Sequence, residues 1–107
     1  MAKLFQGQKI YEVDVTDTAT LQEIIVPTRH YKAIVKSGGD DVFIKWGGSD
    51  VVASAAKTDN VYDDEGIDVL TAGSIQTLQK VGDYDYFSVV CRSGESATVQ
   101  IVVGAGS

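Results

Sequence analysis

The side chains in this sequence that could carry out chemistry are few and scattered. Catalysis by a histidine-activated nucleophile needs a histidine beside a serine or cysteine, and the chain has one histidine, His30, and one cysteine, Cys91. His30 follows Arg29 in a segment expected to be a turn, with no catalytic motif around it. Cys91 falls on the apolar side of an alternating segment, so we expect a small buried hydrophobe without a disulfide partner. We therefore predict that the protein is not an enzyme.

Possible metal ligands gather in one acidic stretch, residues 59–68. Structural zinc sites need more cysteine and histidine ligands than this chain holds. Calcium binds closely spaced carboxylates and carbonyls, but the acids of this stretch do not have the spacing of an EF-hand loop. Because most runs of charge need only water, we expect a solvated acidic loop, and neither a metal site nor any other cofactor.

Trp46 is the residue that could stack on a sugar ring, as in a carbohydrate-binding or adhesion module. It shares an alternating face with Val42 and Ile44, which favours packing in a core over exposure to a ligand. A carbohydrate-binding module of this sequence should instead expose Trp46 and nearby tyrosines. That alternative stays open at this point.

The charge and hydropathy of the chain limit its partners. The formal net charge is −6, whereas nucleic-acid binding needs clustered lysine and arginine to replace counterions. No apolar run approaches the ~20 residues of a membrane span, and the first residues lack the hydrophobic centre of a signal peptide. We expect no nucleic-acid or membrane partner, and synthesis in a cytoplasm.

The elements that must position any site are strands, because apolar and polar residues alternate. Residues 87–91 and 97–103 both alternate in this way. A short loop with Gly94 in the left-handed conformation would join them as a hairpin and place Val89 opposite Ala97. A second hairpin is expected between residues 31–36 and 42–46, joined by a glycine-containing loop.

The whole pattern predicts an all-β fold: a single antiparallel β-sandwich of about seven or eight short strands. The spacing of the strands does not distinguish immunoglobulin-like from jelly-roll connectivity. Residues 9–107 are expected to form the sandwich domain. Residues 1–8 show no clear strand pattern and are expected to form an N-terminal arm that docks on a neighbouring subunit.

Several apolar residues fall on the supposed outer faces of the two hairpins or on the arm. An apolar centre with a charged rim is typical of a modest protein interface. The other interpretation is that loops or the N-terminal segment cover these residues. The interface candidates are Leu4, Phe5, Ile34, Phe43, Tyr86, Val90 and Val102.

Four segments, residues 31–39, 41–48, 71–75 and 96–107, give the chain a resemblance to a known group of proteins. In these segments it is similar to the small β-sandwich virion proteins of tailed bacteriophages, the decoration or cement proteins on capsid shells. The resemblance implies a non-enzymatic structural protein that binds and stabilises the shell.

The same resemblance implies partners and a location. Such proteins are homo-oligomers, often dimers or trimers, bound to capsid or other virion subunits. This chain would then be made in the host cytoplasm and reside in the virion. The alternatives are a phage tail or neck accessory protein, and the carbohydrate-binding or adhesion module described above.

Overall fold

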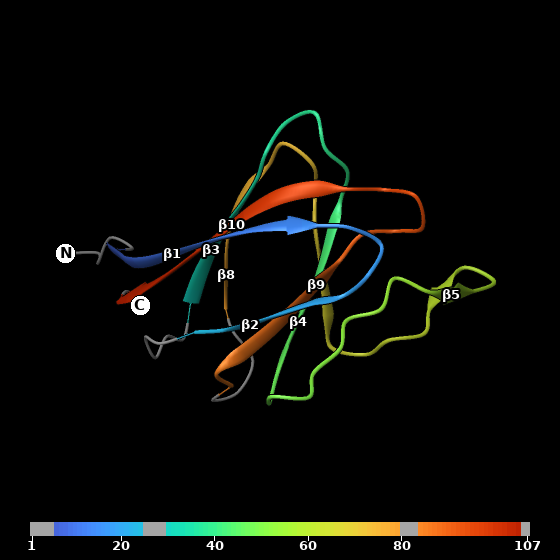
Figure 1. Ribbon diagram of the computed structural model, residues 1–107, viewed down its shortest axis with the longest axis horizontal. Coiled ribbons are helices and arrows are strands. Elements are labelled where there is room, and N and C mark those ends of the chain that lie inside the picture. The colour runs from blue at the N-terminus through green and yellow to red at the C-terminus, as the bar shows by residue number, and fades with distance from the viewer. Residues whose placement is uncertain (1–5, 25–29, 80–83, 106–107) are drawn as a thin grey trace.

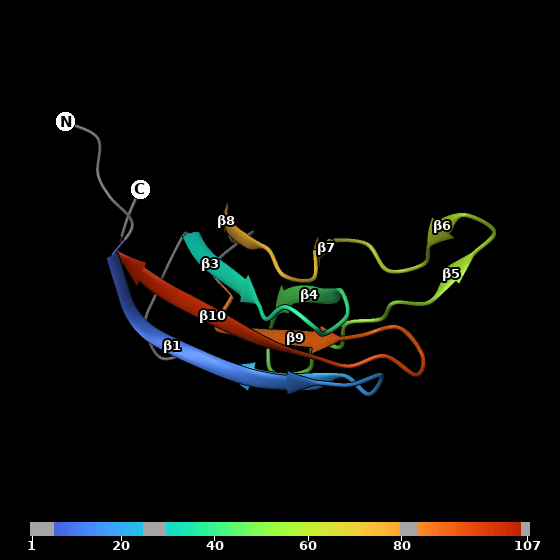
Figure 2. The same ribbon diagram turned by 90° about the horizontal axis from the view of Figure 1, so that it is seen from above.

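The computed structural model describes residues 6–24, 30–79 and 84–105, and within these ranges the chain is an all-β sandwich (Figures 1 and 2). The prediction of a single antiparallel β-sandwich is confirmed. The described residues form no helix long and apolar enough to cross a membrane. In spatial order, sheet A consists of β1 (Gln6–Val15), β10 (Ala97–Ala105), β3 (His30–Val35) and β8 (Ile75–Gln79), and sheet B of β2 (Thr20–Glu23), β9 (Tyr86–Val90), β4 (Val42–Gly47) and β7 (Ile67–Leu70).

The connectivity is that of a jelly roll. The chain folds into four antiparallel pairs, β1 with β10, β2 with β9, β3 with β8 and β4 with β7, and the pairs alternate between the two sheets. This nested pairing, with eight strands in two four-stranded sheets, separates the jelly roll from the immunoglobulin-like alternative. A further small hairpin, β5 (Lys57–Thr58) and β6 (Val61–Tyr62), projects from the end of the sandwich (Figures 1 and 2).

The hairpin predicted near the C-terminus is wrong, although its alternation is right. β9 lies in sheet B between β2 and β4, whereas β10 lies in sheet A between β1 and β3. Val89 is therefore opposite Thr20 and Ile44, and Ala97 is opposite Val15. The two buried faces meet across the core and not side by side. Gly94 does adopt the left-handed conformation, with φ of 77°.

The hairpin predicted between residues 31–36 and 42–46 is wrong for the same reason. β3 pairs with β10 and β8 in sheet A, and β4 pairs with β9 and β7 in sheet B. The connection between them crosses from one sheet to the other. Gly38 turns the chain there with φ of 89°, a conformation that L side chains rarely adopt.

The core lies between the sheets and is organised by aromatic rings. Trp46 is 8% exposed and stands between Tyr31 and Phe87, with ring centroids 5.0 Å and 5.2 Å away. Phe87 also meets the Tyr11 ring edge-on at 6.4 Å. Rings from both sheets thus interlock, as aromatic pairs prefer tilted or edge-to-face contacts. The assignment of Trp46 to the core is confirmed.

The first strand begins earlier than the sequence indicated. β1 starts at Gln6, which lies opposite Ala105, and a bulge falls between Gly7 and Lys9. Residues 6–8 therefore belong to sheet A, although the sequence placed them in the arm. Leu4 and Phe5, the apolar residues predicted to dock the arm, lie outside the described residues.

Candidate association surface

The outer face of sheet A carries an apolar stripe that crosses all four strands. Ile10 on β1 is opposite Val102 on β10, and Ile34 on β3 is opposite Ile75 on β8. Ile34 is also opposite Gln100, two positions before Val102, so Val102 and Ile34 are diagonal neighbours on one face. We call these four apolar residues, Ile10, Val102, Ile34 and Ile75, the sheet A stripe.

The sheet A stripe is open to solvent at both ends. Ile10 is 62% exposed and Ile75 is 65% exposed, each on an edge strand. Ile34 is half-buried and Val102 is buried by its neighbours. An apolar line of two directly opposed pairs that meet diagonally, with exposed ends, is unlike the isolated surface hydrophobics that need no explanation.

The charges that flank the stripe cancel. Lys32 and Lys36 accompany Glu12 and Asp14 on this face, whereas the whole chain carries −6. Glu12 accepts a hydrogen bond from Gln100 at 2.9 Å and forms an ion pair with Lys36 at 3.2 Å. These contacts, the Gln100 bond first, lower the pKa of Glu12. The acidic surplus of the chain therefore lies elsewhere.

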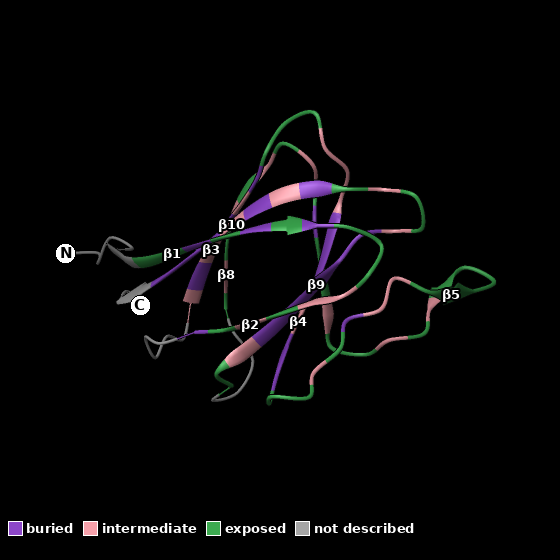
Figure 3. Cartoon of the chain, in the orientation of Figure 1, coloured by how far each residue is buried: buried purple, intermediate pink, exposed green. Residues whose placement is uncertain are grey.

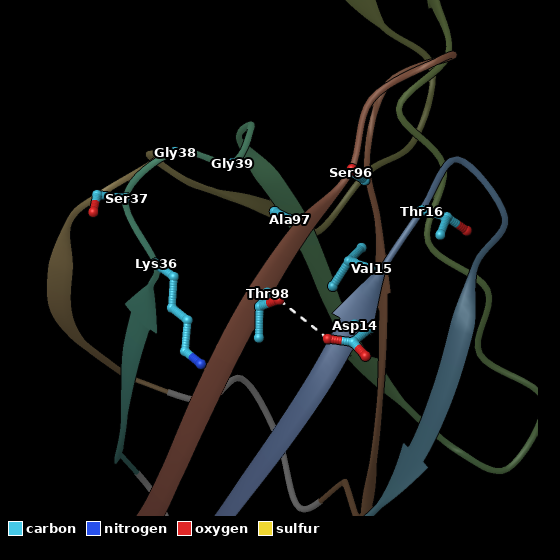
Figure 4. Close-up of a pocket in the computed structure, with 10 residues that line it drawn as sticks. All are labelled: Asp14, Val15, Thr16, Lys36, Ser37, Gly38, Gly39, Ser96, Ala97 and Thr98. Atoms are coloured by element: carbon cyan, nitrogen blue, oxygen red, sulfur yellow. Dashed lines mark hydrogen bonds between the residues drawn. The ribbon is translucent and has the colours of Figure 1, made fainter.

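A shallow depression of about 430 Å³ lies at one end of sheet A (Figure 4). It is lined by the end of β1, the start of β10 and the loop after β3. Its charged side chains already have partners, because Asp14 accepts a hydrogen bond from Thr98 at 3.1 Å and Lys36 contacts Glu12. The lining contains serines but neither histidine nor cysteine.

The two central strands of sheet B, β9 and β4, are covered on their outer face, whereas Leu21 on β2 and Val69 on β7 stay 45% and 43% exposed at its edges. We call residues 48–66, which include the β5–β6 hairpin, the cover loop; its outer parts are largely exposed in Figure 3. The backbone N–H of Ala53 donates to the buried Ser88 hydroxyl at 2.9 Å. Lys45 donates to the Asp64 carboxylate, which also accepts from the Ser54 N–H at 3.0 Å. The cover loop is thus fixed to strands β4 and β9.

Arg92 provides another attachment for the cover loop. Its Nε and Nη2 atoms donate to the Tyr62 hydroxyl at 3.2 Å and 2.9 Å. The guanidinium also lies over the Phe43 ring, 5.0 Å from its centroid. Asp41 and Glu95 are within ion-pair distance, at 3.5 Å and 3.7 Å. Arg92 therefore joins the loop, the sheet and the turn that follows β9.

This cover changes the interpretation of the predicted interface residues. Phe43 and Val90 are 0% and 4% exposed beneath the cover loop, so they are not surface residues, and the prediction is wrong for them. Tyr86 is half-buried and its hydroxyl donates to Glu23 at 3.3 Å. Ile34 and Val102 do lie on the outer face of sheet A.

Sequence reasoning missed the two exposed ends of the stripe. Ile10 shares its face with Glu12 and Asp14, and Ile75 shares its face with Thr77 and Gln79. The signal for each was a lone isoleucine on the polar side of an alternating strand. Such an isoleucine becomes part of an apolar surface patch only when the strand order brings it beside other apolar residues.

The residues considered for chemistry are dispersed. His30 begins β3 and is half-buried, and is not in a turn as predicted. In the acidic stretch, Asp64 turns toward Lys45 whereas Asp68 accepts a hydrogen bond from Tyr31 at 3.4 Å. Burial raises the pKa of that Tyr31 hydroxyl. Within the described residues, no three His, Cys, Asp or Glu side chains gather into a metal-binding group.

Cys91 should be chemically inert in the folded protein. Its thiol is 2% exposed, and burial raises its pKa to about 11, so little of the reactive thiolate forms near neutral pH. A disulfide exchange reagent such as DTNB at pH 8 should react only slowly until denaturant is added. Rapid reaction of the native protein would contradict this placement. Because the pKa is raised, the stability that this group contributes is present below its unfolded pKa and lost as the pH rises toward 11.

Comparisons with known proteins find a similar fold but no family. No family description and no curated protein matches the sequence. One solved chain, from work described as "Bacillus endospore appendages form a novel family of disulfide-linked pili", is similar over 98% of this chain and 93% of that one. The TM-score is 0.50 and the sequence identity is 13%. At this identity the similarity shows a shared fold alone.

Proposed function

We propose that this chain is a non-enzymatic structural subunit that attaches to other protein subunits through the outer face of sheet A. One observation carries the proposal: the sheet A stripe crosses every strand of a sheet whose flanking charges cancel, in a chain of net charge −6. Apolar area provides the free energy of association, and a neutral face lets acidic subunits approach with little repulsion.

The specific assembly that we propose is a phage virion, with the chain as a capsid decoration or cement protein. The support is the resemblance of residues 31–39, 41–48, 71–75 and 96–107 to such proteins. The partners would be capsid or other virion subunits, and the protein would be made in the host cytoplasm. Weak contacts between one copy and the shell are sufficient for this role, because copies that are linked in pairs or larger groups bind with avidity.

A second candidate is a subunit of a pilus-like filament, which the fold similarity to the endospore appendage chain favours. That neighbour is described as belonging to disulfide-linked pili. Here the single cysteine, Cys91, is buried, so a filament of this chain would have to be held together by other contacts. A sugar-binding module is less favoured, because Trp46 lies in the core.

The composition of purified particles separates the candidates. If the protein decorates capsids, mass spectrometry of purified virions of the phage that encodes it should detect it. Electron microscopy of the purified protein should then show small oligomers. Filaments of the purified protein, with none of it in virions, would instead favour the pilus-like role.

The variant Ile10→Lys tests the outer face of sheet A. Burying an isoleucine stabilises an interface by about 1.5–3 kcal/mol, so the lysine should weaken binding to virions by about 10- to 100-fold, measured by co-sedimentation. The matched control is Leu21→Lys, which changes a 45% exposed residue on an edge strand of sheet B. Equal loss in both variants, or no loss with Ile10→Lys, would contradict the proposal. Melting temperatures should be close to wild type for both.

A further inference from the structure

Among the described residues, no strand pairs with the outer edge of β8. The N–H of Val35 donates to the carbonyl of Ser74 at 3.0 Å, which places these two residues at a hydrogen-bonded position of the ladder, although the Ser74 N–H itself donates to Thr71. Hydrogen-bonded and non-hydrogen-bonded pairs alternate along an antiparallel ladder. In β8 it follows that Ile75, Thr77 and Gln79 direct their N–H and C=O groups away from β3.

This edge also lacks the usual protection. Soluble proteins shield edge strands with charges, proline or bulges. The other edges follow that rule: β1 has a bulge and carries Glu12 and Asp14, β2 carries Glu23, and β7 carries Asp68. Residues 71–79, which include all of β8, contain no charged residue. Ile75, which is 65% exposed, is the end of the sheet A stripe at this edge.

We infer that β8 pairs antiparallel with β8 of a second copy, around a two-fold axis at Thr77. The inference rests on the proposed function, since it names one partner of the assembling subunit. In a continuous sheet, outer-face residues must lie opposite outer-face residues. Centring on Thr77, the middle of the outward-directed residues, pairs it with Thr77 of the partner subunit. Ile75 then lies opposite Gln79 of the partner subunit, and every free backbone group of the three residues is used.

A second copy fits this edge better than a charged peptide. Two chains of charge −6 repel each other, and an uncharged strand is the place where they can approach closely. Main-chain pairing provides the affinity, as in other cases of strand addition. The partner's strand has the same composition, so no charge of either sign is buried.

The two-fold arrangement has a functional consequence. An axis perpendicular to the sheet leaves the outer faces of both copies on the same side. The pair therefore presents two sheet A stripes to one surface. Bivalent attachment raises the effective affinity for a regular shell without any new contact. This would let a modest stripe hold the protein on a large assembly.

Cysteine cross-linking of the full-length protein tests the register. Paired residues of this type have Cα atoms about 5.5 Å apart, within the range of about 4.4–6.8 Å that a disulfide allows. We expect Thr77→Cys to form a linked dimer under mild oxidation. Ile75→Cys alone should not, but a mixture of Ile75→Cys and Gln79→Cys chains should form the mixed dimer. Thr77→Cys that links no faster than the control Leu21→Cys would overturn the inference.

Proline substitution provides an independent readout. Thr77→Pro removes an N–H that points away from the sheet, a position where an edge strand tolerates proline. This variant should fold and lose the dimer in sedimentation equilibrium. Gln76→Pro removes an N–H directed at β3 and should instead lower the melting temperature. A folded Thr77→Pro variant that dimerises like wild type would overturn the pairing.

The combined results separate this inference from the proposed function. If Thr77→Cys fails to link while Ile10→Lys still weakens virion binding, the strand pairing is overturned and the function stands. If Thr77→Cys links while Ile10→Lys has no effect, the pairing stands and the proposed attachment face is wrong. If the wild type is monomeric at all concentrations and Thr77→Pro abolishes virion binding, a shell protein occupies the edge, which overturns pairing with a second copy.

Discussion

Phe87→Ala should lower the free energy of unfolding by about 3–5 kcal/mol, the range for removing a buried phenylalanine. Phe87 is 0% exposed on β9, an inner strand of sheet B, and its ring contacts those of Trp46 and Tyr11. The substitution removes apolar contact and leaves a cavity that rigid neighbouring strands can fill only in part. Because small domains are stable by only about 5–15 kcal/mol, much of the total would be lost. Urea unfolding monitored by circular dichroism measures it.

The control for this prediction is Leu21→Ala on the neighbouring strand. Leu21 is 45% exposed on β2, so its truncation should change stability by less than about 0.5 kcal/mol, as for most surface positions. A small effect of Phe87→Ala, comparable with that of Leu21→Ala, would mean that the core between the sheets is not packed as the structure shows.

Alternation in residues 87–91 and 97–103 was enough to identify strands β9 and β10 and their buried faces. Val89, Val99 and Ile101 were each placed on the inner side of a strand, and each is buried. Alternation could not identify which strands pair. Two consecutive strands with matching apolar faces have the same pattern whether they lie side by side in a hairpin or face each other across a sandwich. Both predicted hairpins failed for this reason.

The jelly roll is fixed by contacts between residues far apart in sequence. β1 pairs with β10 along its whole length, from Gln6 opposite Ala105 to Val15 opposite Ala97. Single-sequence periodicity contains no information on such long-range partners. The sequence could therefore predict a sandwich but could not select its topology.

The candidate site was less predictable than the fold. Phe43 and Val90 lie on the outer face of sheet B and were correctly recognised as apolar residues away from the main core. Covering by a loop was one of the two interpretations, but residues 48–66 could not be identified as that loop because they have no strand or helix periodicity. The attachment of that loop depends on distant partners, such as the Ala53 N–H on Ser88 and Tyr62 on Arg92.

Arg92→Ala should release the cover loop while leaving the sandwich folded. The substitution removes the hydrogen bonds to Tyr62 and the stacking of the guanidinium on Phe43. The ion pairs with Asp41 and Glu95 add little, because the Arg92 side chain is 40% exposed and water screens them. We expect the free energy for opening the loop to fall by about 2 kcal/mol. Hydrogen exchange of the Ala53 amide should accelerate by about 30-fold.

Arg92→Lys is the matched variant, because it keeps the charge but not the planar fork that reaches the Tyr62 hydroxyl. Its effect on exchange of the Ala53 amide should fall between those of wild type and Arg92→Ala. Amides of β10, in the other sheet, should exchange at wild-type rates in both variants. Uniform acceleration across both sheets would show that Arg92 stabilises the whole domain and not the loop alone.

Opening of the cover loop would also expose Phe43 and Val90, which form a buried apolar cluster with Ala53 of the loop itself. Exposed apolar area promotes association, so Arg92→Ala should bind a hydrophobic dye such as ANS more strongly than wild type and self-associate at lower concentration. That association should persist when Thr77→Pro is added, because it uses sheet B and not the β8 edge. If Thr77→Pro abolished the association of Arg92→Ala, that association would be the β8 pairing of the folded protein. The proposal that the cover loop prevents association through sheet B would then be wrong.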